Sequence, residues 1–225
     1  MKKLILVFLC ALMFVACGGG FTAKEREVIY SGEGDIMRLV TIADKADSLL
    51  LRSTSKPMTE KMVQSEEFST LCRRMLATVK DPSNEGVGIA APQVGVLRRM
   101  VAVQRFDKQG EPFEFYLNPE IVALMGEQKF GGEGCLSVPN QYGQVARSQQ
   151  IVLRYRDCNF VEHTDTISGF TAVICQHEVD HLSIRYLQVE HYQDHIDPLL
   201  LFLYLHLFDR QILPVCLHLY GHIQL

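Results

Sequence analysis

The stretch 176–182 reads Gln-His-Glu-Val-Asp-His-Leu and constrains the fold of this chain more than any other feature. Its two histidines, His177 and His181, are four residues apart, so an α-helix stacks both imidazoles on one face, within reach of a single metal ion. Glu178 lies about 100° further round such a helix, where it can act as a general base without being a ligand. The stretch therefore predicts a metal-binding helix over residues 170–181.

This spacing alone leaves the reaction open. Two histidines at this separation also occur by chance on surface helices, and zinc peptidases combine the same pattern with a third ligand further along the chain. The residues available downstream match no peptidase spacing; they are Glu190, His191 and His195. An upstream candidate is Cys135, which is flanked by glycine and can offer a thiolate to the same site, although such a cysteine is most often a buried thiol.

A third segment, residues 86–93, reads Gly-Val-Gly-Ile-Ala-Ala-Pro-Gln. Its small residues let the backbone approach a ligand closely, and Gln93 offers an uncharged amide donor for a developing oxyanion. Taken alone, the segment is more typical of a tight strand turn than of a binding loop. It is not a phosphate-binding loop, because no Gly-Lys-Ser/Thr follows.

The remaining pattern predicts an α+β fold in which antiparallel strands surround the C-terminal helix that carries both histidines. Apolar residues recur at intervals of three and four over residues 64–80, which is typical of an amphipathic helix, and Ser65 suits its N-cap. Between the two helices we expect short antiparallel strands rich in β-branched and aromatic residues, at residues 99–105, 113–117, 120–124, 150–155 and 161–167.

Charge and cysteine content exclude several classes of protein. The chain has 225 residues, with 22 Lys and Arg against 26 Asp and Glu and a formal net charge of −4. We therefore expect no nucleic-acid binding by bulk charge. The seven cysteines show no regular spacing, so the pattern indicates neither a disulfide framework nor a zinc ribbon, and most of them are expected to be buried thiols.

The first residues have the pattern of an export signal. Lys2 and Lys3 precede an uncharged apolar run over residues 4–15, which is too short for a stable membrane span and suits a secretory signal peptide. Ala16 and Cys17 then lead into three glycines, an arrangement that resembles the lipobox of bacterial lipoproteins. We therefore expect cleavage before Cys17 and attachment of lipid to its side chain.

Together, GVGIAAPQ, EGCLS and QHEVDHL resemble, in this order and spacing, the three signature motifs of peptide deformylases. In that family one divalent ion, Fe²⁺ and often Zn²⁺ or Ni²⁺ in its place, is held by the motif cysteine and the two helix histidines. These are Cys135, His177 and His181 here. The resemblance implies a hydrolase that removes the formyl group from N-formylmethionyl peptides or nascent chains and releases formate.

The resemblance also implies roles for the residues around the ion. Glu178 would take a proton from the attacking water and return it to the leaving amine, while Gln93 and the backbone N–H of Leu136 would bind the oxyanion. Two further pairs are implied: the backbone of Val87 and Gly88 for the peptide, and Glu133 with Arg147 as a brace for the cysteine loop. Asp180 either holds a helix end or histidine, or is a solvated carboxylate.

These expectations divide the chain into four parts. They are a signal peptide (1–16), a lipidated N-terminus and tether (17–36), a peptide-deformylase-like catalytic domain (37–190) and an atypical hydrophobic tail (191–225). The tail packs on the domain, contacts a membrane, or is a frameshift product. The expected location is the cell envelope, by a lipid anchor, whereas a start at Met37 would give a cytoplasmic enzyme.

Two other functions are open. A non-catalytic lipoprotein that binds formyl peptides is suggested by Ile184, which stands where the family usually has glycine. A metallopeptidase that uses the His-Glu-x-x-His pattern would leave Cys135 and Gln93 unexplained.

Overall fold

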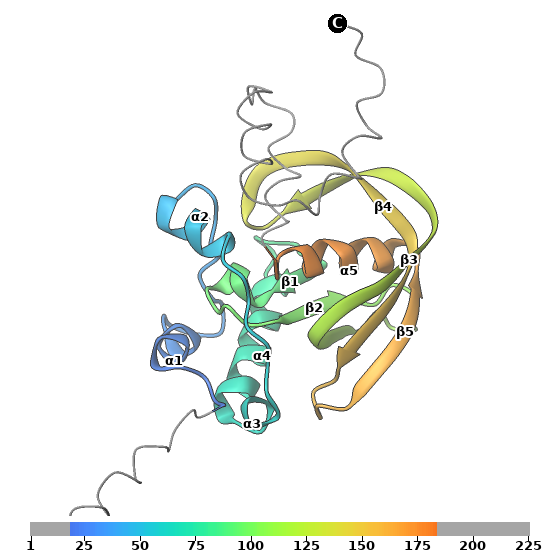
Figure 1. Cartoon of the computed structure of the whole chain (residues 1–225). Helices are drawn as coiled ribbons and strands as arrows, with labels where there is room; N and C mark the ends of the chain where they lie inside the picture. Colours follow the sequence, from blue (N-terminus) through green and yellow to red (C-terminus); the bar gives the residue numbers. More distant parts are fainter. Residues whose placement is uncertain (1–18, 184–225) are drawn as a thin grey trace, which may run out of the picture. The chain divides into compact units, whose positions relative to one another are not determined.

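The structure is a computed structural model that describes residues 19–183 (Figure 1). Cys17, Ile184 and the hydrophobic tail lie outside the described residues, so lipidation and the nature of the tail stay predictions. The helices of the described part are α1 (Ala23–Tyr30), α2 (Lys45–Leu51), α3 (Glu60–Val63), α4 (Glu66–Lys80) and α5 (Phe170–Asp180), with a 3₁₀ turn, η1 (Ala91–Val94). None of these helices is long and apolar enough to cross a bilayer.

Five strands form one antiparallel sheet in the order of the sequence. They are β1 (Gly88–Ala90), β2 (Met100–Gln104), β3 (Phe113–Cys135), β4 (Val138–Arg156) and β5 (Glu162–Ser168). Because the order follows the chain, β1 is one edge of the sheet and β5 the other. The α+β class and the antiparallel pairing are as predicted.

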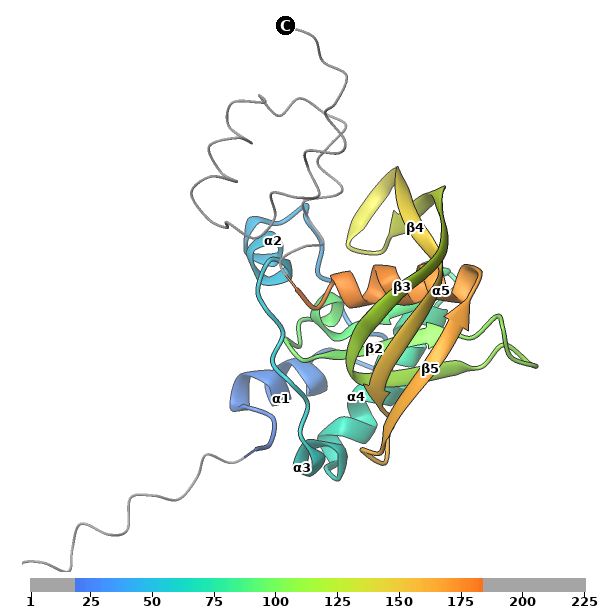
Figure 2. The ribbon, with the colours of Figure 1, turned by 45° about the vertical axis from the view of Figure 1, so that its right-hand side comes forward.

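The strands differ from prediction in length. The expected strands 113–117 and 120–124 are both parts of β3, which continues to Cys135, and the expected strand 150–155 is the end of β4. Pro119 interrupts the sequence pattern of β3, and a register shift between Leu117 and Glu120 accommodates it. The result is one long hairpin of β3 and β4, which curves over α5 (Figures 1 and 2).

Strand β2 is buried on both faces and separates two apolar cores. Met100 and Ala102 belong to the core that contains the apolar face of α4, whereas Val101 and Val103 belong to the core that contains α5. Neighbouring side chains of a strand point to opposite faces, so a run of four buried residues is what a strand between two layers requires. Helix α5 thus lies in the interior, against β1, β2 and β4.

Both predicted helices are present. Helix α4 begins after Ser65, whose hydroxyl accepts a hydrogen bond from the Phe68 N–H at 3.3 Å, as its predicted N-cap. Helix α5 begins after Gly169, which has φ of 66° and provides no side-chain cap. His181 is the C-cap residue of α5, so the two histidines occupy its last turn as the spacing predicts.

The predicted tether is largely folded. Helix α1 has a capping box formed by Thr22 and Glu25, and Phe21 and Ile29 are buried in the core shared with α4. This fold was not predicted, because most residues of the segment are polar and just two apolar side chains within residues 19–36 are buried. Its main contacts are made by distant arginines, which no local pattern reveals.

Those arginines, Arg74 and Arg98, bind the N-terminal segment through hydrogen bonds. Buried Arg74 of α4 donates to the carbonyl oxygens of Ile29, Ser31 and Ile36. Arg98 donates to both carboxylate oxygens of Glu25, at 2.5 and 2.9 Å, and its side chain is 9% exposed. The segment is therefore part of the packed unit from Phe21 onward.

The apolar face of α4 should carry much of the stability of this unit. Leu71 is fully buried, so we expect Leu71→Ala to lower the free energy of unfolding by about 2–5 kcal/mol, because it removes packed atoms and leaves a cavity. Leu49→Ala is the matched control, since this leucine is 61% exposed, and should change stability by less than about 0.5 kcal/mol. Urea unfolding measures both; equal effects would contradict the described packing.

Candidate active site

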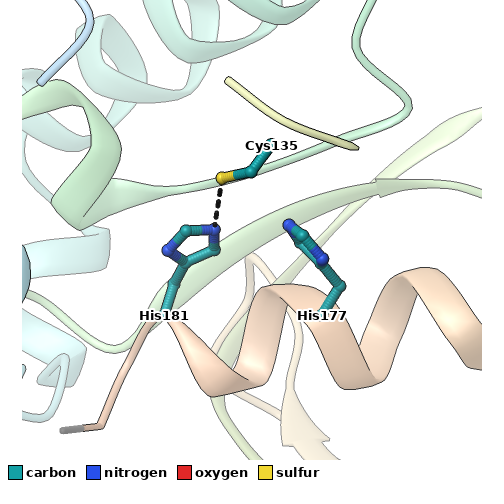
Figure 3. Close-up of side chains that lie close together, drawn as sticks. All are labelled: Cys135, His177 and His181. Atoms are coloured by element: carbon teal, nitrogen blue, oxygen red, sulfur yellow. Dashed lines mark hydrogen bonds between the residues drawn. The ribbon is translucent and has the colours of Figure 1, made fainter. Parts of the chain in front are cut away.

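Three side chains that the sequence separates widely converge at one point (Figure 3). Cys135 is the last residue of β3, His177 lies in α5 and His181 caps that helix; one ligand atom from each lies within 4.8 Å of the others. The Cys135 sulfur is 3.5 Å from His181 Nε2. One thiolate and two imidazoles suit a borderline divalent transition metal, and three protein ligands leave a position open for chemistry. The donor set therefore fits the predicted ion.

A carboxylate orients the first imidazole. His177 Nδ1 lies 2.9 Å from Glu133 Oε2, a contact that places the proton on Nδ1 and leaves Nε2 to bind the metal. Burial acts to raise the pKa of Glu133, but the hydrogen bonds from His177 and Arg147 lower it to about 2. Glu133 is therefore ionised at neutral pH and holds the imidazole in place.

Arg147 joins this carboxylate to the end of the helix. Its guanidinium donates to both oxygens of Glu133, at 2.8 and 3.0 Å, and to Asp180 Oδ2 at 2.6 Å. The side chains of Arg147 and Glu133 are each 11% exposed. The structure thus brings the predicted pair together and resolves the alternatives for Asp180, which is held by Arg147 at the end of α5.

Glu178 is buried beside the ligands. It is 4% exposed, and among residues 19–183 no hydrogen-bond donor contacts its Oε2 atom. Burial is the main reason that the pKa of Glu178 is raised, to about 7. A buried carboxyl group with one free oxygen and a pKa near neutrality has the properties of a general acid–base catalyst.

Gly88 makes room for this carboxylate. A Cβ atom at Gly88 would lie 2.4 Å from Glu178 Oε1, far inside van der Waals contact. Gly88 belongs to the edge strand β1, so one side of its backbone faces away from the sheet. The Val87 carbonyl oxygen, by contrast, already accepts a hydrogen bond from the Gln104 N–H at 2.9 Å.

Gln93 and Leu136 both line the cleft with Cys135. Gln93 is buried in η1; its Oε1 accepts a hydrogen bond from the Ala90 N–H at 2.8 Å, and its Nε2 points to the sulfur at 3.6 Å. Leu136 follows Cys135 directly in the turn between β3 and β4. The bond from Ala90 fixes the amide so that its N–H₂ group faces the metal site.

A cleft of about 840 Å³ gives access to the site. Its walls include Gly88, Gln93, Cys135, His177 and Glu178, together with residues of the curved β3–β4 hairpin. Two aromatic residues of that hairpin, Phe130 and Tyr142, also line the cleft and were not predicted from the sequence; they are 76% and 84% exposed. Aromatic residues among closely spaced glycines were the available signal. The Ser137 N–H, 3.3 Å from the Cys135 sulfur, was also missed.

The Glu133 contact with His177 should strengthen metal binding. We expect Glu133→Gln to weaken the affinity for Ni²⁺ by about 10- to 100-fold, because a carboxylate behind the imidazole orients the ring and raises its basicity. Glu127→Gln is the matched control on the same strand, since Glu127 is largely exposed and, within residues 19–183, forms its one ion pair with Lys129. Competition with a chromophoric chelator measures both affinities. Equal affinities of the two variants would contradict this role.

Comparison with known proteins gives one consistent family. The family model described as polypeptide deformylase matches residues 36–195. A peptide deformylase of Leptospira biflexa is 40% identical over 145 residues, covering 61% of this chain and 80% of that protein. One of Chlorobium luteolum is 38% identical over 137 residues, covering 60% of this chain and 69% of that protein.

Solved structures agree with this. A peptide deformylase of Acinetobacter baumannii with bound Met-Ala-Ser has a TM-score of 0.60 and 30% identity, covering 68% of this chain and 98% of that one. The Thermotoga maritima enzyme has a TM-score of 0.59 and 29% identity, covering 72% and 99%. The residues matched by the family model include the whole sheet, α5 and the three converging segments, and this chain belongs to the polypeptide deformylase family.

Proposed function

We propose that this chain removes the formyl group from N-formylmethionyl peptides at the site formed by Cys135, His177 and His181. The observation that carries the proposal is the buried Glu178 carboxyl beside these three ligands, with a free oxygen and a glycine opposite it. A protein that only binds formyl peptides would gain nothing from a buried carboxyl group without a hydrogen-bond donor, because such a group lowers the stability of the fold. A peptidase would leave the thiol ligand and Gln93 without a role.

The proposed ion is a single divalent metal, most suitably Fe²⁺, with Zn²⁺ or Ni²⁺ as substitutes. When bound, it supplies Lewis acidity, which polarises the formyl carbonyl and makes water easier to deprotonate. One thiolate and two imidazoles support a first-row transition ion over Mg²⁺ or Ca²⁺, which prefer oxygen ligands.

Residues of this chain would carry out the proton transfers and bind the oxyanion. Glu178 takes a proton from water as the water oxygen attacks the formyl carbon. The developing oxyanion accepts hydrogen bonds from Gln93 Nε2 and from the Leu136 N–H. Glu178 then gives its proton to the amine nitrogen as the C–N bond breaks, so formate and a free N-terminus are released. A pKa near 7 allows Glu178 to perform both proton transfers.

The peptide would bind beside β1 as an added strand. An edge strand leaves backbone groups unpaired on its outer side, which is the arrangement used in strand addition. On β1, the backbone of Gly88 is the proposed hydrogen-bond partner of the peptide. Next to it, the backbone of Val87 would also contact the peptide, although its carbonyl oxygen already accepts a hydrogen bond from Gln104. The Acinetobacter baumannii peptide deformylase has been solved with bound Met-Ala-Ser, which supports a peptide ligand for this chain.

We also propose that the chain is anchored in the cell envelope by lipid at Cys17. The basic start, the apolar run over residues 4–15 and the glycines after the cysteine support this location. A start at Met37 would remove α1 together with buried Phe21 and Ile29, and would leave Arg98 without its carboxylate partner. That packing supports a chain that begins upstream of α1.

Activity should depend on Gln93 through the oxyanion. We expect Gln93→Leu to reduce formate release from a formyl-Met peptide by about 10²–10³-fold, because one transition-state donor is lost. Gln144→Leu, at an exposed position of β4, is the matched control and should retain activity. Formate is assayed with the Ni²⁺- or Fe²⁺-loaded full chain under anaerobic conditions. No release by the metal-loaded wild type would favour the formyl-peptide binder.

Gly88→Ala should inactivate the enzyme without removing the metal. The added Cβ would displace the Glu178 carboxyl, so we expect formate release to fall by about 10²-fold or more while bound metal stays at the wild-type level. Gly143→Ala is the matched control, because a Cβ there meets open space. Metal content and formate release are measured on the same samples. Full activity of Gly88→Ala would contradict the role of Glu178 as base.

A further inference from the structure

Two cysteines outside the active site lie side by side although the sequence separates them widely. Cys72 is in the first half of α4 and Cys158 is in the turn between β4 and β5, and each thiol shifts the pKa of the other. Two views of the fold place this turn beside the first half of α4 (Figures 1 and 2). Both cysteines carry free thiols in the structure.

The turn that carries Cys158 is held by its own hydrogen bonds. Asp157 Oδ1 accepts from the N–H groups of Asn159 and Val161, each at 2.9 Å. The backbone closes the turn twice, from Asp157 N–H to the Val161 carbonyl oxygen and from Phe160 N–H to the Asp157 carbonyl oxygen, both at 2.9 Å. The position of Cys158 is thus fixed before any bond forms.

Apolar packing holds this turn on the core to which α4 belongs. Cys72 and Phe160 both pack against the same buried core, which contains Leu71 and Met75 of that helix. The Arg156 guanidinium lies 4.8 Å from the centre of the Phe160 ring and donates to the Phe160 carbonyl oxygen at 2.9 Å. The turn that carries Cys158 and the helix that carries Cys72 therefore share one packed core.

The two thiols differ in access and in charge. Cys158 is exposed and Cys72 is half-buried. The hydrogen bond from Cys72 lowers the pKa of Cys158, whereas the same bond, together with burial, raises the pKa of Cys72. An exposed thiol that is stabilised as thiolate reacts first with a disulfide from solution, and a buried neighbour can then complete the exchange.

We propose that Cys72 and Cys158 are a disulfide-forming pair that closes when the protein meets a small-molecule or protein disulfide. The Cys158 thiolate attacks one sulfur of that disulfide and releases the other as a thiol. The Cys72 thiolate then attacks the Cys158 sulfur and releases the second thiol. The pair loses two protons and two electrons, and the external disulfide gains them.

The bond would join α4 to the turn between β4 and β5. It would close a long loop that contains β1, β2, β3 and β4, and cross-links of long loops restrict the unfolded chain most. The inference does not depend on deformylation, because neither cysteine lies in the cleft. A protein exported to an oxidising compartment would gain this stabilisation, whereas cytosolic thiols would keep the pair reduced.

The bond can be identified by mass spectrometry. The Ni²⁺-loaded full chain is equilibrated with oxidised and reduced glutathione, alkylated, and digested with trypsin and a glutamate-specific protease. We expect peptide 68–73 joined to peptide 157–162 with the loss of two hydrogen atoms. These peptides contain no other cysteine, so the product is distinct from any bond to Cys135 or Cys175.

Thermal unfolding of the same samples gives a second readout. We expect oxidation to raise the Tm by about 5–15 °C, from the usual stabilisation by a disulfide and the size of this unit. Cys158→Ser should abolish both the joined peptide and the Tm increase, and the exposed position of Cys158 makes this substitution structurally mild. Cys216→Ser is the control that leaves the pair intact and should retain both effects.

Two results would overturn the proposal. One is a glutathione adduct on Cys158 with a free thiol at Cys72 after full equilibration. The other is an equal Tm increase in Cys158→Ser, which would assign the stabilisation to other cysteines. Formate release measured alongside keeps the two proposals separate, because loss of activity without the joined peptide concerns the active site and not this pair.

Discussion

The largely buried guanidinium of Arg147 links the elements that form the active site. It lies on β4, binds the Glu133 carboxylate on β3 and reaches Asp180 near the end of α5. The metal ligands come from two of these three elements, since Cys135 ends β3 and His177 lies in α5. This contact adds a fixed link between hairpin and helix to the packing of α5 against β1, β2 and β4, so it helps to set the separation between the thiol and the imidazoles. The geometry of the metal site therefore depends on this ion pair.

Burial strengthens the ion pair between Arg147 and Glu133, and it also makes the loss of either partner destabilising. A guanidinium that binds a carboxylate through two parallel hydrogen bonds is directional, and water competes little at 11% exposure. Removal of one partner would leave a buried charge unpaired, which costs more than the pair contributes. The same carboxylate also accepts from His177, so orientation of the ligand and attachment of the hairpin rely on one residue.

Local sequence patterns predicted the parts of this protein that depend on local rules. The spacing of the two histidines and the apolar stripe of α4 each follow from helical geometry, and both helices are present. The length of the β3–β4 hairpin could not be predicted in this way. Its outer half is rich in glycine and exposed, so it lacks the alternation that marks a half-buried strand, and Pro119 interrupts β3 without ending it.

The contacts that sequence could not predict are between distant residues. Helix α1 was expected to be a tether, because no local feature shows that Glu25 meets Arg98 or that Arg74 binds the backbone around Ile29. The Arg147 contact with Asp180 was undecided for the same reason. The expected ligands, base and oxyanion donors came from the resemblance to the deformylases, because these residues lie in short motifs that can be read from the sequence. It gave no information on α1, which begins before the region that the family shares.

The Oε2 atom of Glu178, which has no hydrogen-bond donor among residues 19–183, lowers the stability of the fold, and packing elsewhere must compensate for this. An unpaired carboxyl group in a buried position opposes folding, and here Gly88 contributes no side chain to cover it. Two apolar cores flank β2, and the Met100–Gln104 strand is buried on both faces. Helix α5 has no side-chain N-cap and ends in the metal ligands, so packing against this sheet, and not local capping, holds Glu178 in its costly position. Stability in the layers around β2 thus permits the destabilising arrangement that the chemistry requires.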